Sequence, residues 1–200
     1  MKQTNDAHSN DLFKILISPA LTALVIVDHQ MAFGQCFDFK AVESAEIGVA
    51  ELLGAAEKIN IPVIASLVKT NLIGPELSPR LESMISTPAL FNRSGINPWN
   101  DPAFARAVQD ANRPNLLIAG LSAETSLSFT ALCALERGYD VHVVRDACLG
   151  YSEYSIATTF DRLMQAGVVP VSWRQVILEW SQGNVDAGLL RRILKSVKST

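Results

Sequence analysis

The sequence predicts an α/β fold in which helices cover both faces of a parallel sheet. Two observations support this prediction. Apolar runs rich in β-branched residues alternate with helical patterns along the 200 residues, and such alternation is typical of parallel sheets. Hydrophobic residues make up 48% of the chain and charged residues 18%, a composition typical of a globular protein rather than a disordered one.

Six short apolar runs have the pattern of strands buried on both faces. They span residues 22–28, 62–67, 89–92, 115–120, 141–146 and 168–172. Helical patterns span residues 42–59, 79–85, 101–111, 124–137, 152–166, 173–180 and 186–197. We expect residues 1–20 to form a polar tail and lead-in, and residues 21–200 to form one domain. The Gly-, Pro- and Asn-rich stretch 69–100 is expected to be a long loop region, and such loops are often functional.

Several classes of protein are disfavoured. The net charge is −3 and no basic stripe is present, which argues against a nucleic-acid partner. No apolar run is long enough for a membrane span or signal peptide, so a cytoplasmic protein without membrane contact is expected. The three cysteines and three histidines form neither a disulfide framework nor a metal-ligand motif. We therefore expect no metal and no cofactor.

Ligands of such sheets bind beyond the carboxyl ends of the strands, and three places in the sequence lie there. Asp28 closes the first strand, where a carboxylate either accepts a proton or caps the next turn. Arg93 lies in the long loop region and either orients a substrate or remains on the surface. The turn from Gly120 to Ser126 leads into a helix whose free N–H groups could hold an oxyanion, and the alternative is ordinary capping by Ser122 or Thr125.

Cysteines and aromatic residues allow two interpretations each. Cys133 lies within an apolar helical stretch and is expected to be an inert core thiol. Cys148 follows a strand near the carboxyl edge, and Cys36 lies in the loop after the first strand, so either could face a cleft. Phe33 and Trp99 could line an apolar pocket or belong to the core.

Five segments occur in one order: VIVDHQ, RSGINPW, GLSAETS, ALERGYDVHVVRDA and RLMQAGVVPVSW. Together they resemble the isochorismatase-like cysteine hydrolases, most closely the small branch with an R-x-G-x-N-x-W loop. The resemblance covers roughly residues 23–178. It implies a three-layer, Rossmann-like α/β/α fold around a six-stranded parallel sheet.

The resemblance also implies a catalytic triad of Asp, Lys or Arg, and Cys. Asp28 matches the aspartate, and Arg93 matches the basic residue, with Asn92 as the competing alignment. Ser126 stands where the family has its nucleophilic cysteine. Backbone groups at Ser122 and Ala123 would help to hold the oxyanion. The substrate pocket would include Phe33, Trp99 and Glu124.

The implied function is hydrolysis of a small carbonyl compound, with an amide or other C–N bond favoured. A serine hydroxyl is a much weaker acid than a thiol, whose pKa is about 8.5, so three explanations of Ser126 remain open. The chain is an engineered Cys-to-Ser variant, a natural divergent enzyme that uses acid–base chemistry through Asp28, or a catalytically inactive small-molecule-binding or scaffold protein. Substitutions beside Ser126, at Ser122, Ala123 and Thr125, favour natural divergence. The family forms dimers, tetramers and octamers, so a homo-oligomer is expected.

Overall fold

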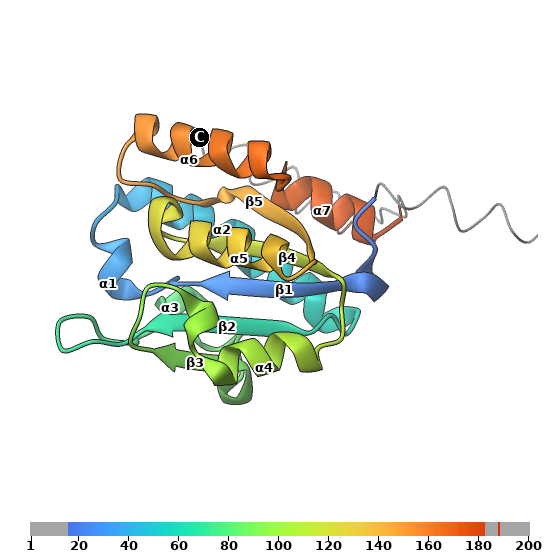
Figure 1. Cartoon of the computed structure of the whole chain (residues 1–200), viewed down its shortest axis with the longest axis horizontal. Coiled ribbons are helices and arrows are strands. Elements are labelled where there is room, and N and C mark those ends of the chain that lie inside the picture. Colours follow the sequence, from blue (N-terminus) through green and yellow to red (C-terminus); the bar gives the residue numbers. More distant parts are fainter. Residues whose placement is uncertain (1–15, 183–187, 189–200) are drawn as a thin grey trace, which may run out of the picture.

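The computed structural model describes residues 16–182 and residue 188. Apart from residue 188, the predicted helix over 186–197 lies outside the described residues, as does most of the predicted tail. Six strands form one sheet: β1 (Thr22–Val27), β2 (Val63–Val68), β3 (Leu90–Arg93), β4 (Asn115–Gly120), β5 (Asp140–Cys148) and β6 (Val169–Val171). Their order is β3-β2-β1-β4-β5-β6, and every neighbouring pair is parallel (Figure 1). This confirms the predicted α/β fold and its six-stranded parallel sheet.

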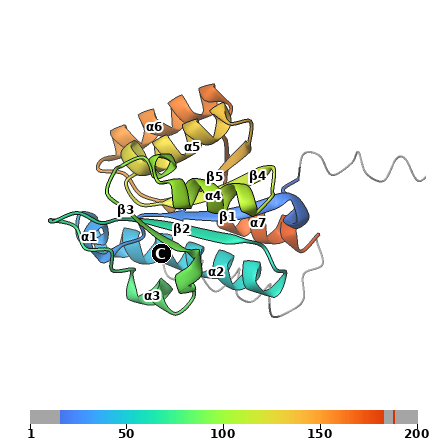
Figure 2. The same ribbon diagram turned by 60° about the horizontal axis from the view of Figure 1, so that its bottom comes forward.

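Helices cover both faces of the sheet. They are α1 (Met31–Gly34), α2 (Phe39–Lys58), α3 (Pro79–Glu82), α4 (Pro102–Asp110), α5 (Ser128–Glu136), α6 (Glu153–Ala166) and α7 (Trp173–Trp180). Figure 2 shows α4, α5 and α6 on one face and α2, α3 and α7 on the other. None of the helices among the described residues is long and apolar enough to cross a membrane.

The central strand β1 shows why the sheet is buried. Its sequence TALVIV is rich in β-branched residues, and all six residues are buried. Leu24 and Ile26 pack into the core beneath α2 and α7, while Val25 and Val27 pack into the core beneath α4, α5 and α6. Each such side chain contributes about 1.5–3 kcal/mol relative to an exposed position, so β1 anchors both layers.

Polar caps set the helix boundaries. The carboxylate of Asp101 accepts hydrogen bonds from the N–H groups of Ala103 and Phe104, which starts α4. Ser152 and Ser155 form a reciprocal capping box at the start of α6. Gly167 ends α6 with a left-handed φ of 108°, as the sequence predicted.

The chain differs from the predictions at the carboxyl edge. Helix α2 starts at Phe39 rather than 42, because the carboxylate of Asp38 accepts the Ala41 N–H. Short helix α1 was not predicted. The predicted helix over 124–137 is divided into a π-helical turn, Ala123–Leu127, and α5.

Strand β5 is longer than predicted because its pairing with β4 is irregular. The register passes from Ile118 opposite Val143 to Gly120 opposite Cys148, so extra residues of β5 bulge out. The bulge brings the end of β5 beside the end of β4, where the candidate site begins.

Candidate functional site

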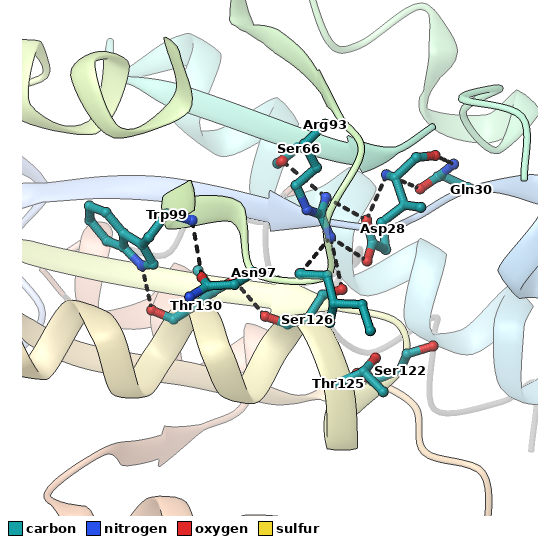
Figure 3. Close-up of polar contacts among 12 residues, drawn as sticks. Asp28, Gln30, Ser66, Arg93, Asn97, Trp99, Ser122, Thr125, Ser126 and Thr130 are labelled. Atoms are coloured by element: carbon teal, nitrogen blue, oxygen red, sulfur yellow. Dashed lines mark hydrogen bonds and ion pairs between the residues drawn. The ribbon is translucent and has the colours of Figure 1, made fainter. Parts of the chain in front are cut away.

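Asp28, Arg93 and Ser126 come from three separate segments and meet at the carboxyl edge of the sheet (Figure 3). The Arg93 guanidinium binds the Asp28 carboxylate in a bidentate manner, with Nη1 donating to Oδ1 and Nη2 to Oδ2, each at 2.8 Å. Nη2 also donates to Ser126 Oγ at 2.8 Å. The three residues are only 0%, 3% and 1% exposed, respectively. The structure therefore brings the three residues of the expected triad into one buried cluster.

The backbone conformation of Asp28 directs its carboxylate into this cluster. Side chains alternate between the faces of a strand, so Asp28 should follow Leu24 and Ile26 toward α2. Instead, Asp28 has a left-handed φ of 54°, and its carboxylate meets Arg93 on the face where Phe91 packs. Left-handed backbone is uncommon outside glycine and concentrates at functional sites.

The two oxygens of Asp28 differ in their hydrogen bonds. Oδ1 accepts from Arg93 Nη1 and, at 3.1 Å, from the Val68 N–H. Oδ2 accepts only from Arg93 Nη2 among the described residues. A carboxylate oxygen has two lone pairs, so Oδ2 keeps one that could accept a proton.

Arg93 is tightly held. Nη1 also donates to Ser66 Oγ at 3.0 Å, and Nη2 to the Ile96 carbonyl at 3.2 Å. The competing residue Asn92 is exposed, which favours Arg93 as the basic member of the site. Because Asp28 compensates its charge, Arg93 offers Ser126 a charge-assisted hydrogen bond rather than a free positive charge.

A tight turn places Ser126 in this environment. A Cβ at Gly120 would lie 2.7 Å from the Val27 carbonyl oxygen, so only glycine fits where β4 ends. The chain then turns through Ser122, whose φ is 57°, into the π-helical turn. Ser126 lies in the first turn, where N–H groups lack partners within the helix. The Thr130 hydroxyl donates to the Ser126 carbonyl at 2.6 Å and fixes this turn.

One expected oxyanion donor is already occupied. The Ala123 N–H donates to the Leu149 carbonyl at 2.7 Å, so an oxyanion held there would have to replace this hydrogen bond. The role of Ala123 in holding an oxyanion stays a prediction. The Ser122 hydroxyl is hydrogen-bonded to the Tyr151 hydroxyl at 3.1 Å, and the expected role of the Ser122 backbone stays a prediction.

Two of the expected pocket residues serve as anchors between segments. Trp99 is 5% exposed and belongs to the core, and its indole N–H donates to the Thr130 carbonyl at 2.9 Å. It thereby ties the loop after Arg93 to the helix that carries Ser126. Glu124 accepts the Tyr151 N–H at 2.8 Å. It also accepts the Ser155 hydroxyl.

The third expected pocket residue, Phe33, is partly buried and lies on α1, the short helix that was not predicted. The place of Phe33 in a substrate pocket stays a prediction.

None of the three cysteines replaces Ser126. Cys148 is buried, its thiol donates to the Val144 carbonyl at 3.0 Å, and burial raises its pKa to about 12, which makes it inert. Cys133 lies in α5 and accepts a hydrogen bond from the Asn97 side-chain amide at 3.5 Å. Cys36 is exposed.

Sequence reasoning missed two residues that shape the cluster, Ser66 and Gln30. Ser66 is fully buried and holds Arg93; a single serine within the apolar run PVIASL was its signal. Gln30 donates to the Val68 carbonyl at 2.8 Å and accepts the Val68 N–H at 2.7 Å, and it stands two residues after Asp28 in VIVDHQ. Among the described residues, no group of three His, Cys, Asp or Glu side chains could hold a metal.

Known proteins share this architecture. A probable hydrolase from Escherichia coli, YcaC, is 32% identical over 159 residues, which are 78% of this chain and 76% of that protein. Isochorismatase family protein 2A of Dictyostelium discoideum is 28% identical over 177 residues, or 84% and 86% of the two chains.

Solved structures agree. The E. coli YcaC structure, described as an octameric hydrolase of unknown specificity, has a TM-score of 0.81 at 28% identity and covers 91% of this chain and 90% of its own. YcaC from Pseudomonas aeruginosa, with hexane-2,5-diol and covalent acrylamide, has a TM-score of 0.81 at 27% identity and covers 92% of each chain. Residues 22–175 match the isochorismatase domain family. The chain therefore belongs to the isochorismatase domain family.

Proposed function

We propose that the chain is a hydrolase of a small carbonyl compound, with an amide or other C–N bond as the bond broken. The observation that carries the proposal is the buried cluster in which Arg93 Nη2 lies 2.8 Å from both Asp28 Oδ2 and Ser126 Oγ. Arg93 Nη2 therefore donates hydrogen bonds both to Ser126 Oγ, the oxygen at the nucleophile position, and to Asp28 Oδ2, which keeps a free lone pair.

In the first step, Ser126 Oγ attacks the carbonyl carbon while its proton passes to Asp28 Oδ2. The new bond is C–Oγ, and the carbonyl π electrons move onto oxygen. When the tetrahedral intermediate collapses, the C–N bond breaks and the amine nitrogen takes the proton from Asp28. Water then attacks the ester, which releases the acid and returns a proton to Ser126.

Arg93 helps Ser126 to act as a nucleophile. As Ser126 loses its proton, negative charge develops on Oγ, and the Nη2–H group pointing at it stabilises that charge in a buried, water-poor place. Asp28 remains a weaker base than the histidine of a serine hydrolase, because a carboxylate is intrinsically less basic than an imidazole. We therefore expect slow turnover, and faster turnover for Ser126→Cys, since a thiol ionises more readily.

The test is a panel of small amides, esters and nitriles, run on the unmodified chain and on Ser126→Cys and Ser126→Ala. Ser126→Ala keeps the Asp28–Arg93 ion pair and is the matched blank. Turnover by the unmodified chain that disappears in Ser126→Ala supports the proposal. Turnover that persists unchanged in Ser126→Ala contradicts a nucleophilic role for Ser126 and favours acid–base chemistry through Asp28.

One observation favours a second candidate function, a small-molecule-binding protein without turnover. The bidentate Arg93 pair occupies the carboxylate that would act as base. Activity in Ser126→Cys alone would support this candidate, since it would show an intact hydrolase site disabled by serine.

We also propose that the chain assembles as a homo-oligomer, because the E. coli YcaC structure is octameric. Size-exclusion chromatography with light scattering measures the assembly. A monomer at every concentration would contradict this proposal.

A further inference from the structure

Arg93 carries a hydrogen-bond donor that the buried cluster does not use. Its Nη1 and Nη2 groups contact Asp28, Ser66 and Ser126. Its Nε–H, in contrast, is buried and has no hydrogen-bond partner among the described residues. Arg93 is only 3% exposed, so bulk solvent does not reach this group. A buried donor without an acceptor costs about 1–3 kcal/mol, and an oxygen brought by a ligand would remove that cost.

The Nη2 group of Arg93 has more acceptors than hydrogens. It carries two hydrogens, but three oxygens lie within hydrogen-bond distance. Asp28 Oδ2 and Ser126 Oγ are each at 2.8 Å, and the Ile96 carbonyl oxygen is at 3.2 Å. Because the Ile96 carbonyl oxygen is the most distant of the three, its hydrogen bond is the weakest and the easiest to replace.

The unused Nε–H and one hydrogen of Nη2 lie on the same edge of the planar guanidinium, which we call the Nε edge. The fixed fork geometry of arginine points both hydrogens the same way, so one ligand oxygen can accept from both. The other edge, formed by Nη1 and Nη2, already holds the Asp28 carboxylate. An oxygen on the Nε edge would share Nη2 with Ser126 Oγ, so its carbon would lie beside the oxygen at the nucleophile position (Figure 3).

The segment that would have to move for a ligand to enter is exposed. Arg93 and Ser126 are 3% and 1% exposed, so a substrate reaches them only when a covering segment withdraws. Residues 94–96 are all exposed, and a Cβ at Gly95 would meet nothing within 4 Å. Trp99 anchors the chain just beyond them through its hydrogen bond to the Thr130 carbonyl. A short withdrawal of residues 94–96 would therefore free Nη2 for a ligand and leave this anchor in place.

We propose that the Nε edge of Arg93 binds the carbonyl oxygen of the substrate, which takes the place of the Ile96 carbonyl on Nη2. The inference rests on the proposed function. As Ser126 Oγ bonds to the carbonyl carbon, negative charge passes to the carbonyl oxygen, where Nε–H and Nη2–H stabilise it. Arg93 is then a catalytic residue that contacts the substrate, in addition to its contacts with Asp28 and Ser126.

Nuclear magnetic resonance of arginine Nε–H groups tests the inference. Acetamide is the probe, because it presents an amide carbonyl with small substituents. The protein is Ser126→Ala, which keeps the Asp28–Arg93 pair and has no hydroxyl to react. We expect the Arg93 Nε proton to shift downfield as acetamide is added, until the shift saturates. The carbonyl carbon of Ile96, observed through the Asn97 N–H, should shift over the same acetamide concentrations.

Arg113 provides the matched control. Its Nε is also buried without a hydrogen-bond partner among the described residues, but it precedes the amino end of β4, at the opposite edge of the sheet. Its Nε–H signal should not move. Arg93→Lys keeps a positive charge beside Asp28 but has no Nε–H. This change should weaken acetamide binding, measured at the Ile96 carbonyl, by at least about tenfold, and Arg113→Lys should not.

The loss of one signal in Arg93→Lys also identifies the Nε–H of Arg93. If Arg93→Lys does not fold, through-bond correlations from Nε to the Arg93 backbone identify the signal instead. A signal that stays in place throughout the acetamide titration overturns the inference, as does an equal shift of the Arg113 signal.

The result is separable from the proposed function. A shift of the Arg93 signal in Ser126→Ala, combined with no turnover by the unmodified chain, supports the carbonyl site and removes only the hydrolase proposal. Turnover that depends on Ser126, combined with an unmoved Arg93 signal, removes only the role of the Nε edge.

Discussion

The ring of His29 should make the stability of this protein depend on pH. His29 follows Asp28, is 0% exposed, and neither ring nitrogen has a hydrogen-bond partner of good geometry. Burial lowers its pKa from 6.5 to about 4, and the nearby Ala147 backbone offsets only part of this effect. As the pH falls, His29 is therefore protonated near pH 6.5 in the unfolded chain but only near pH 4 in the folded chain.

The sign and size of the effect follow from these two values. Above pH 6.5, His29 is neutral in both states and no stability is lost. As the pH falls from 6.5 to 4, protonation favours the unfolded chain. The full loss is about 3 kcal/mol, at 1.36 kcal/mol per pKa unit, and about 2 kcal/mol is lost by pH 5.

Urea denaturation at pH 7 and pH 5 measures this loss, with tryptophan fluorescence as the signal and a fixed protein concentration. His29→Gln is the matched variant, because it removes the titrating ring. Other groups with perturbed pKa values, such as His142 and Asp146, contribute equally to both proteins. The free energy of unfolding should fall by about 2 kcal/mol more in the unmodified chain than in His29→Gln. Equal falls would refute the reasoning.

Two further substitutions test the packing of the site. Asp28→Asn leaves the Arg93 guanidinium buried without its carboxylate and should lower the free energy of unfolding by about 3–5 kcal/mol; urea denaturation at pH 7 measures it, and a loss below 1 kcal/mol would contradict a buried ion pair. Gly120→Ala places a Cβ 2.7 Å from the Val27 carbonyl oxygen and should cost about 1–3 kcal/mol. Its control is Gly95→Ala, where nothing lies within 4 Å of the added Cβ, and thermal melts that coincide for the two variants would show that the turn tolerates a side chain.

The sequence was sufficient for the sheet and for the residues at its carboxyl edge. Residues that follow the carboxyl ends of parallel strands meet at one edge of the sheet, where ligands bind. This rule selected Asp28 and the turn before Ser126 from the sequence. The resemblance selected Arg93 over Asn92 by motif, and burial of Arg93 agrees with that choice.

Other features of the site depend on backbone details that no local pattern encodes. The left-handed φ of Asp28 reverses the direction that strand alternation predicts. The contact of the Ala123 N–H with Leu149 depends on the β5 bulge, which joins residues distant in sequence. An aromatic residue in a loop can line a pocket or belong to the core, so the sequence left both open for Trp99. Its packing in the core and its hydrogen bond to the Thr130 carbonyl could be learned only from the structure.

The strand order has a consequence for how the chain folds. Strand β1 lies at the centre of the sheet, but residues 28–114 separate it from its partner β4. Until β4 pairs, one edge of a strand that is apolar at all positions after Thr22 is open, and open edges of this kind template aggregation. Because Ser126 follows β4 directly, the cluster assembles only after this slow, long-range pairing. A variant that loosens the β1–β4 pairing is therefore expected to lose the site and to aggregate in the same step.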